Sequence, residues 1–273
     1  MKKFIICFTL SIIVSIMCVN FSLAEETTTD SSKPIVSFTP RVWYMMQNVN
    51  SYNNSTTNQY STQQLNMVMY GGTISIAPRS FQSTDFLFTV LHGTGSAIST
   101  SVSTGSGSDK TDQDRTDFEF LVRHRLGESN ANIFYGARYV IWNNKKTMIG
   151  PGTYDVTGTN THENDGSILY PEVGVGYTTN ITKDGMNRLF GNITVGYGYA
   201  WEEAKNPRPG YTGETKNSWS TYLIDINAGY EFVLNKYFAA HARYRCSMMK
   251  VSDPSENYML VLHGPEVGIK GSF

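Results

Sequence analysis

The chain has 273 residues, a formal net charge of −1, only 16% charged residues and 13% aromatic residues. The near-neutral charge excludes a nucleic-acid-binding protein, which would need a basic face, and the length suits one domain. The mean hydropathy of −0.29 argues against a bundle of membrane helices, but it suits strands whose apolar and polar faces average out.

Residues 1–24 have the pattern of a secretory signal peptide. Lys2 and Lys3 give a positive start, a mostly apolar stretch follows, and the small residue Ala24 favours cleavage before Glu25. An uncleaved anchor helix is the alternative. The rest of the chain contains no second apolar run of 18 residues that could pack against such a helix.

After cleavage we expect a short polar periplasmic leader at 25–35 and one domain at 36–273. Of the three cysteines only Cys246 would remain, so no internal disulfide can form even in an oxidising compartment. Something else must therefore stabilise the mature chain, and backbone hydrogen bonding around a closed sheet is sufficient.

The domain repeats a two-residue alternation separated by polar breaks. In 222–234 the even positions are uncharged, while Asp225 and Glu231 occupy odd positions. Successive side chains of a strand point to opposite faces, so one face is apolar and the other polar. The predicted strands are 36–48, 64–77, 84–93, 116–126, 131–143, 167–180, 188–201, 219–234, 237–249 and 259–273.

The links between these strands alternate in length. Long outer loops and short periplasmic turns are typical of outer-membrane barrels, and about ten tilted residues span the roughly 25 Å apolar band. The even strand number places both ends of the domain on the periplasmic side. The long links are 49–63, 94–115, 144–166, 202–218 and 250–258, and the short links are 78–84, 127–130, 181–187 and 235–236.

The last strand carries its own signal. It ends at Phe273, with Val267, Ile269 and Gly271 on the same face. This resembles the terminal strand of small bacterial outer-membrane β-barrel proteins of the porin-like or adhesin-like class. In that class the closing aromatic residue belongs to the signal read by the barrel assembly machinery. The resemblance covers the whole mature chain in architecture but only the final strand as a motif.

The resemblance implies a ten-stranded antiparallel transmembrane β-barrel in the outer membrane of a Gram-negative bacterium. Its partners would be membrane lipid, lipopolysaccharide and the assembly machinery. The competing fold is a soluble all-β sandwich or barrel with the apolar face turned inward. That fold would have to pack many tyrosines in its core without any stabilising disulfide bond.

If the apolar face meets lipid, the polar face lines the lumen. Eight strands are just filled by side chains and ten leave little more room, so paired charges would plug the lumen. The alternative is a narrow water-filled channel with its ion preference set by arginines. The predicted lumen-lining charges are Arg41, Glu119, Arg123, Arg125, Arg138, Glu172, Asp225, Glu231, His241, Arg243, Arg245, Glu266 and Lys270.

Some outer-membrane barrels are enzymes, and the ten-stranded omptin proteases place an aspartate pair opposite an Asp-His pair at the outer rim. Here Asp112 and Asp114 lie in one predicted outer loop, and His162 with Asp165 in the next. The tight Asp-x-His spacing of the omptin family is absent, because two residues separate His162 from Asp165.

Other chemistries have weaker support. The His-x-Ser pattern of lipid A deacylases does not occur. His241 and Ser247 share a strand face but lie about 20 Å apart, too far for a phospholipase-type triad. The acidic run from Asp109 to Asp117 lacks the ligand spacing and glycine of an EF-hand loop. No catalytic, cofactor-binding or metal-binding residue is predicted.

We therefore expect a non-enzymatic outer-membrane barrel that presents extracellular loops in a surface, structural or adhesin-like role, with its lumen plugged by charges. Loops on a rigid scaffold commonly carry recognition, so an extracellular ligand would bind there. A narrow passive porin-like channel is the second hypothesis. An omptin-like surface protease is the third.

Overall fold

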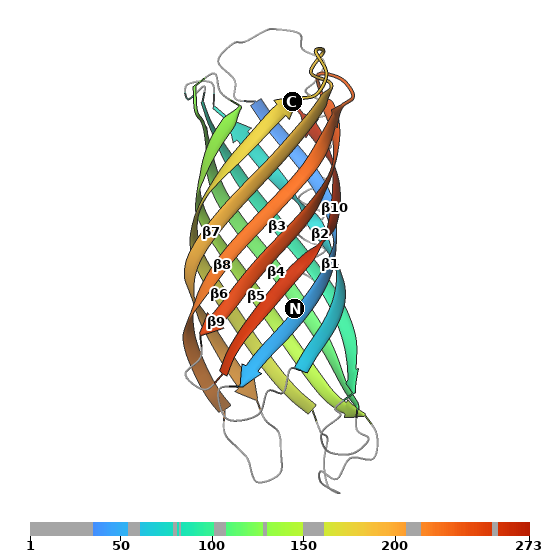
Figure 1. The fold of residues 1–273 in the computed structure, drawn as a ribbon, viewed down its shortest axis with the longest axis vertical. Coiled ribbons are helices and arrows are strands. Elements are labelled where there is room, and N and C mark those ends of the chain that lie inside the picture. The colour runs from blue at the N-terminus through green and yellow to red at the C-terminus, as the bar shows by residue number, and fades with distance from the viewer. Residues whose placement is uncertain are drawn as a thin grey trace, which may run out of the picture.

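A computed structural model shows a closed barrel of ten antiparallel strands, which confirms the predicted fold class (Figure 1). It describes residues 35–53, 61–78, 81, 83–100, 108–127, 130–149, 161–205, 214–252 and 256–273. The predicted signal peptide, the leader before residue 35 and the centres of the five long links lie outside these ranges. Within the described ranges, no helix is long and apolar enough to cross a membrane.

Each strand pairs with its neighbour in sequence, and β1 closes the barrel against β10. At the closure the backbone N–H of Phe273 donates to the carbonyl of Val36 at 2.8 Å, and the N–H of Val36 donates back at 3.2 Å. The strands are β1 Ile35–Asn53, β2 Ser61–Ala77, β3 Thr84–Thr100, β4 Ser108–Arg125, β5 Ala131–Ile149, β6 Thr161–Asn180, β7 Asn187–Lys205, β8 Glu214–Val233, β9 Phe238–Ser252 and β10 Glu256–Ser272.

The strands are longer than predicted at their outer ends. The expected loop 94–115 is largely sheet, because β3 continues to Thr100 and β4 begins at Ser108, with Ser96 opposite Asp112 in the register. That boundary prediction was wrong. Apolar alternation marks only strands with one apolar face, whereas backbone hydrogen bonds form equally well in this Ser/Thr/Asp-rich tract.

An apolar belt surrounds the outside of the barrel. The alternation of each strand points its larger apolar side chains outward, where they are exposed, and charged outward side chains begin only beyond the belt, at Asp114, Asp165 and Glu203. The belt includes Val42, Tyr44, Val68, Phe88, Phe120, Tyr135, Val173, Val175, Ile193, Val195, Tyr197, Ile224, Val267 and Ile269. So large an apolar surface fits a lipid environment and not water.

The strands extend well beyond the belt. Strands of 15 to 20 residues at a tilt near 40° are roughly 40 to 50 Å tall, against about 25 Å for the apolar band of a barrel in a membrane. The surplus lies at the end with the long links, which the outer-membrane pattern makes the extracellular end. The barrel therefore projects as a rigid rim above the membrane surface.

Short turns connect the strands at the opposite, periplasmic end, where the C-terminus lies (Figure 1). Between β6 and β7, the Asp184 carboxylate accepts hydrogen bonds from the Thr182 hydroxyl at 2.5 Å and the Met186 N–H at 2.9 Å. These two hydrogen bonds hold the pKa of Asp184 below its usual range. Between β8 and β9, the Asn235 side chain accepts from the N–H groups of Tyr237 and Phe238. Such side-chain contacts fix tight turns without a long loop.

The outer half of the barrel interior is filled by apolar side chains. Inward Leu65, Met67 and Met69 of β2 have at most 2% of their surface exposed. They belong to one buried cluster with Trp43, Met45, Leu91, Ala97, Ile168, Tyr170, Ala200, Trp219, Leu223, Met249 and Leu262. We refer to this set as the apolar plug. These side chains pack against one another and fill much of the interior at this level.

Candidate functional site: the barrel lumen

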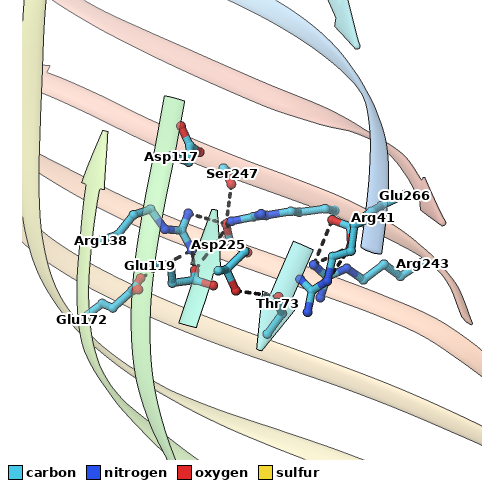
Figure 2. A network of polar contacts seen from close by, with 12 residues as sticks. Arg41, Thr73, Asp117, Glu119, Arg138, Glu172, Asp225, Arg243, Ser247 and Glu266 are labelled. Carbon is cyan, nitrogen blue, oxygen red and sulfur yellow. Dashed lines mark hydrogen bonds and ion pairs between the residues drawn. The ribbon is translucent and has the colours of Figure 1, made fainter. Parts of the chain in front are cut away.

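A hydrogen-bonded ion network centred on Asp225 crosses the middle of the lumen (Figure 2). The Asp225 Oδ2 atom accepts from Arg138 Nη1 at 2.8 Å, from Arg245 Nη2 at 2.8 Å and from the Ser247 hydroxyl at 2.5 Å. These side chains come from β5, β8 and β9. A buried carboxylate needs this many donors to offset its lost hydration.

Two further carboxylates complete this central network. Glu119 of β4 accepts a hydrogen bond from Arg138 and lies 3.9 Å from Arg245. Glu172 of β6 lies 3.6 Å from Arg138 and is fully buried. Arg138 thereby bridges carboxylates from β4, β6 and β8, and its own side chain is only 3% exposed. The network joins both arginines to carboxylates from other strands across the lumen.

A second network surrounds the buried Glu266 of β10. Its carboxylate lies 2.8 Å from Arg243, 3.7 Å from Arg41 and 3.8 Å from the His241 ring. Figure 2 shows Glu266 beside the Asp225 group, with Arg41 and Arg243 pointing toward it. Here cationic groups outnumber the carboxylate, the opposite of the central network. The guanidinium of Arg245 also lies over the ring of Trp43, 4.9 Å from its centroid, which joins the ions to the apolar plug.

The remaining predicted charges lie toward the periplasmic end. Asp85 of β3 accepts hydrogen bonds from Arg123 and Arg125 of β4. Glu231 lies 3.3 Å from Arg188 of β7. Lys270 of β10 has no carboxylate within ion-pair distance among the residues that the structure describes. The carboxylates of Glu231 and Asp85 act on its charge from a longer distance.

Sequence reasoning missed several charged residues of the interior. Arg115 and Asp117 of β4 are both buried and form a bidentate pair, with distances of 2.6 and 3.1 Å. They share the parity of Glu119, which was the available signal, but Arg115 had been placed in a loop and Asp117 weighed only as a calcium ligand. Asp85 and Arg188 were missed because each stands at the start of a strand beside a turn.

Two cavities flank the filled middle of the lumen. The periplasmic cavity measures about 520 Å³ and is lined by Arg41, Arg123, Arg243 and Lys270, among others. The outer cavity is smaller, about 260 Å³, and is lined by polar and aromatic side chains such as Gln113 and Trp142. The ion networks and the apolar plug lie between these two spaces.

Of the residues weighed as a protease site, the described Asp112, Asp114 and Asp165 all have outward parity and do not face the lumen. Asp112 and Asp114 lie on β4 with outward parity, because Gln113 and Arg115 between and beside them are buried inside. Asp112 instead lies 3.0 Å from Lys110, with both side chains 44% exposed. Asp165 accepts a hydrogen bond from Asn143 on the outer surface. The side chain of His162 lies outside the described residues.

The outward histidines have local partners. Outward His92, His124 and His263 contact the hydroxyls of Thr116, Thr84 and Tyr244 at 3.0, 3.1 and 2.6 Å. Within the described part of the chain, no three His, Cys, Asp or Glu side chains are grouped to hold a metal ion. The candidate site is therefore the ionic lumen and its periplasmic cavity.

No protein-family model and no curated protein matches the chain. Among solved structures, the outer membrane protease OmpT from Escherichia coli is similar over 91% of this chain and 99% of that chain, with a TM-score of 0.53 and 11% identity. The translocator domain of the autotransporter NalP from Neisseria meningitidis matches over 96% of both chains with a TM-score of 0.47 and 9% identity.

At 11% identity the likeness to OmpT shows the fold alone, and the TM-score of the NalP match is too low to carry an argument. The closed antiparallel barrel, its exposed apolar belt and the likeness in fold lead to one conclusion. The chain is a bacterial outer-membrane β-barrel.

Proposed function

We propose that this chain is a non-enzymatic cell-surface barrel with a closed lumen, which presents its projecting rim and outer loops for recognition. The observation that carries the closed lumen is the cross-lumen network of Arg138, Asp225 and Arg245, stacked against the apolar plug. Ions would have to break several buried, charge-assisted hydrogen bonds to pass.

The rim supports a recognition role. Above the apolar belt the outward surface of β4 to β6 carries exposed ion pairs, such as Lys145 with Glu163 at 3.4 Å. Exposed ion pairs of this kind contribute little to stability. Their side chains can therefore exchange these contacts for contacts with a binding partner. A rigid scaffold that holds polar loops clear of the lipid is suited to contact with other surfaces.

The outward direction of Asp112 and Asp114 argues against the protease hypothesis. In a water-activating site the acidic groups must face one another across a cleft, within hydrogen-bond reach of the substrate. Here Asp112 pairs with Lys110 on the outer surface. We therefore expect no cleavage of dibasic peptides by the purified barrel, and no effect of Asp112→Asn on any residual background.

Conductance in a planar lipid bilayer tests the closed lumen. We expect insertion of the purified barrel to give no resolved single-channel steps above the bare bilayer. Reproducible ohmic steps would favour the narrow passive channel instead. In that case Arg243→Gln should change the ion preference, because Arg243 lines the periplasmic cavity.

Display on a non-adherent bacterium tests the recognition role. Cells that carry the barrel should bind immobilised host-type surfaces more strongly than cells with an empty vector. A variant with the exposed rim ions removed (Lys145→Ser with Glu163→Ser) is the first comparison, and Lys236→Ser in a periplasmic turn is its control. Equal binding by cells with and without the barrel would contradict the proposal.

A further inference from the structure

The periplasmic cavity has the size and the lining of a ligand site. Its volume of about 520 Å³ falls within the range of small-molecule pockets, roughly 300 to 1,000 Å³. Its inner wall includes Arg41 and Arg243, which contact Glu266 in the ion network beyond it. The cavity is therefore a dead end that is open on the side of the short turns.

The charge of the lining is unbalanced. Six basic side chains line the cavity, whereas three carboxylates serve them as ion-pair partners, namely Glu231, Asp85 and Glu266. This leaves a surplus of three positive charges, and each carboxylate is already shared or bound. The basic side chains are Arg41, Arg123, Arg125, Arg188, Arg243 and Lys270.

The basic side chains of the cavity are incompletely paired, although Arg41 and Arg243 each lie within ion-pair distance of Glu266. The Nε atoms of Arg41 and Arg243 are buried and have no hydrogen-bond partner among the described residues. Lys270 has no carboxylate within 4 Å in the same part of the structure, and its ammonium group offers three donors. Six cationic side chains that share three carboxylates repel one another, so a negatively charged acceptor inside the cavity is electrostatically favourable.

We propose that this cavity binds a compact oxyanion with two or more negative charges, which enters from the periplasm. Guanidinium groups match phosphate and carboxylate oxygens in charge and geometry, and asparagine amides from Asn132 and Asn192 add neutral donors to the wall. This site goes beyond the closed, surface-presenting barrel, which requires no ligand in its lumen.

Calorimetric titration of the full mature barrel in zwitterionic detergent at low salt tests the site, with pyrophosphate and citrate as probes. We expect saturable binding of one anion per barrel by at least one of the two probes. Binding should weaken steeply as sodium chloride is added, because added salt screens the attraction. If neither probe binds saturably, or if salt has no effect, the proposal is wrong.

Variants at Lys270 test the location. Loss of one charge-assisted contact predicts that Lys270→Gln weakens the binding by about tenfold or more, while Lys270→Arg, which keeps the charge, stays within about threefold. The matched control is Lys236→Gln, because Lys236 is a lysine at the same end of the barrel that contacts the Tyr237 ring in an exposed turn. Equal weakening by the Lys270→Gln and Lys236→Gln variants would overturn the proposal, since it would reduce the effect to overall charge.

Discussion

Arg138 on β5 donates a hydrogen bond across the lumen to Asp225 on β8, with 2.8 Å between Nη1 and Oδ2. The two strands are not neighbours in the sheet, and both side chains are only 3% exposed. A buried pair of this kind stabilises a fold only when every charge has partners. The contacts of Arg245 and Ser247 to the same carboxylate meet that condition for Asp225, whereas Arg138 Nε and both carboxylate oxygens of Glu172 make no hydrogen bond among the described residues.

Removal of the Asp225 carboxylate should therefore destabilise the barrel strongly. Asp225→Ala leaves Arg138, Arg245 and Ser247 buried without their shared acceptor, and we expect a loss of about 3 to 5 kcal/mol in the free energy of unfolding. Urea unfolding in detergent micelles, followed by tryptophan fluorescence, measures this loss. Asp112→Ala, which removes an exposed ion pair, should cost less than about 1 kcal/mol. Equal costs for the two variants would contradict a structural role for the network.

The apolar plug makes a separate prediction. Trp43 is completely buried inside the barrel, so Trp43→Ala leaves a large void and should cost about 3 to 5 kcal/mol. Its neighbour Tyr44 points outward and is 43% exposed, so Tyr44→Ala should cost clearly less in the same micelles. Denaturation midpoints of the two variants, measured side by side, test this order. If Tyr44→Ala lost more stability than Trp43→Ala, the assignment of the packed core to the inward face would be wrong.

A charge in the apolar belt should be unfavourable in lipid. Val195 lies outward, near the middle of the belt on β7, and is 46% exposed. We expect Val195→Arg to cost about 2 to 4 kcal/mol in reversible folding into lipid vesicles. Ser218→Arg places the same charge above the belt, beside the exposed Tyr199 hydroxyl, and should cost about 1 kcal/mol or less. Similar costs at both positions would argue against the assigned membrane level.

Phe273 should matter for assembly rather than for the stability of the finished barrel. Its side chain is 47% exposed, while its backbone closes β10 against Val36. We expect Phe273→Ala to reduce the amount of folded barrel in the outer membrane several-fold and to leave unfolding of the purified protein little changed. Heat-modifiable mobility of membrane fractions measures the first quantity. If Phe273→Ala left the amount of folded barrel in the outer membrane unchanged, Phe273 would not be an assembly signal.

The fold could be predicted from the sequence because lipid imposes a strict two-residue rule. The alternation in 222–234 places Asp225 and Glu231 on the face opposite the tyrosines, and β8 follows that parity. The rule fails above the membrane, where both faces of a strand are polar. For that reason the alternation rule predicts a loop where the structure has the outer ends of β3 and β4.

The contents of the lumen were harder to predict. Leu65, Met67 and Met69 face inward, whereas the outward residues between and beyond them are polar at Asn66 and apolar at Val68 and Tyr70. Alternation therefore does not show which face of β2 lines the lumen. Parity placed Arg138 and Asp225 on the polar face of their strands. Their pairing depends on how the closed barrel brings strands β5 and β8 across from each other, which the spacing of 87 residues between them does not reveal.

The most direct test of which face meets lipid uses the four tryptophans. Trp43, Trp142 and Trp219 belong to the interior or pack against the apolar plug, whereas Trp201 lies on the outside and is 45% exposed. In vesicles of brominated lipid we predict clear quenching of tryptophan fluorescence in the natural protein and near-complete loss of that quenching in Trp201→Phe. If the Trp201→Phe variant is quenched as strongly as the natural protein, the interior tryptophans contact lipid and the assignment of the two faces is wrong.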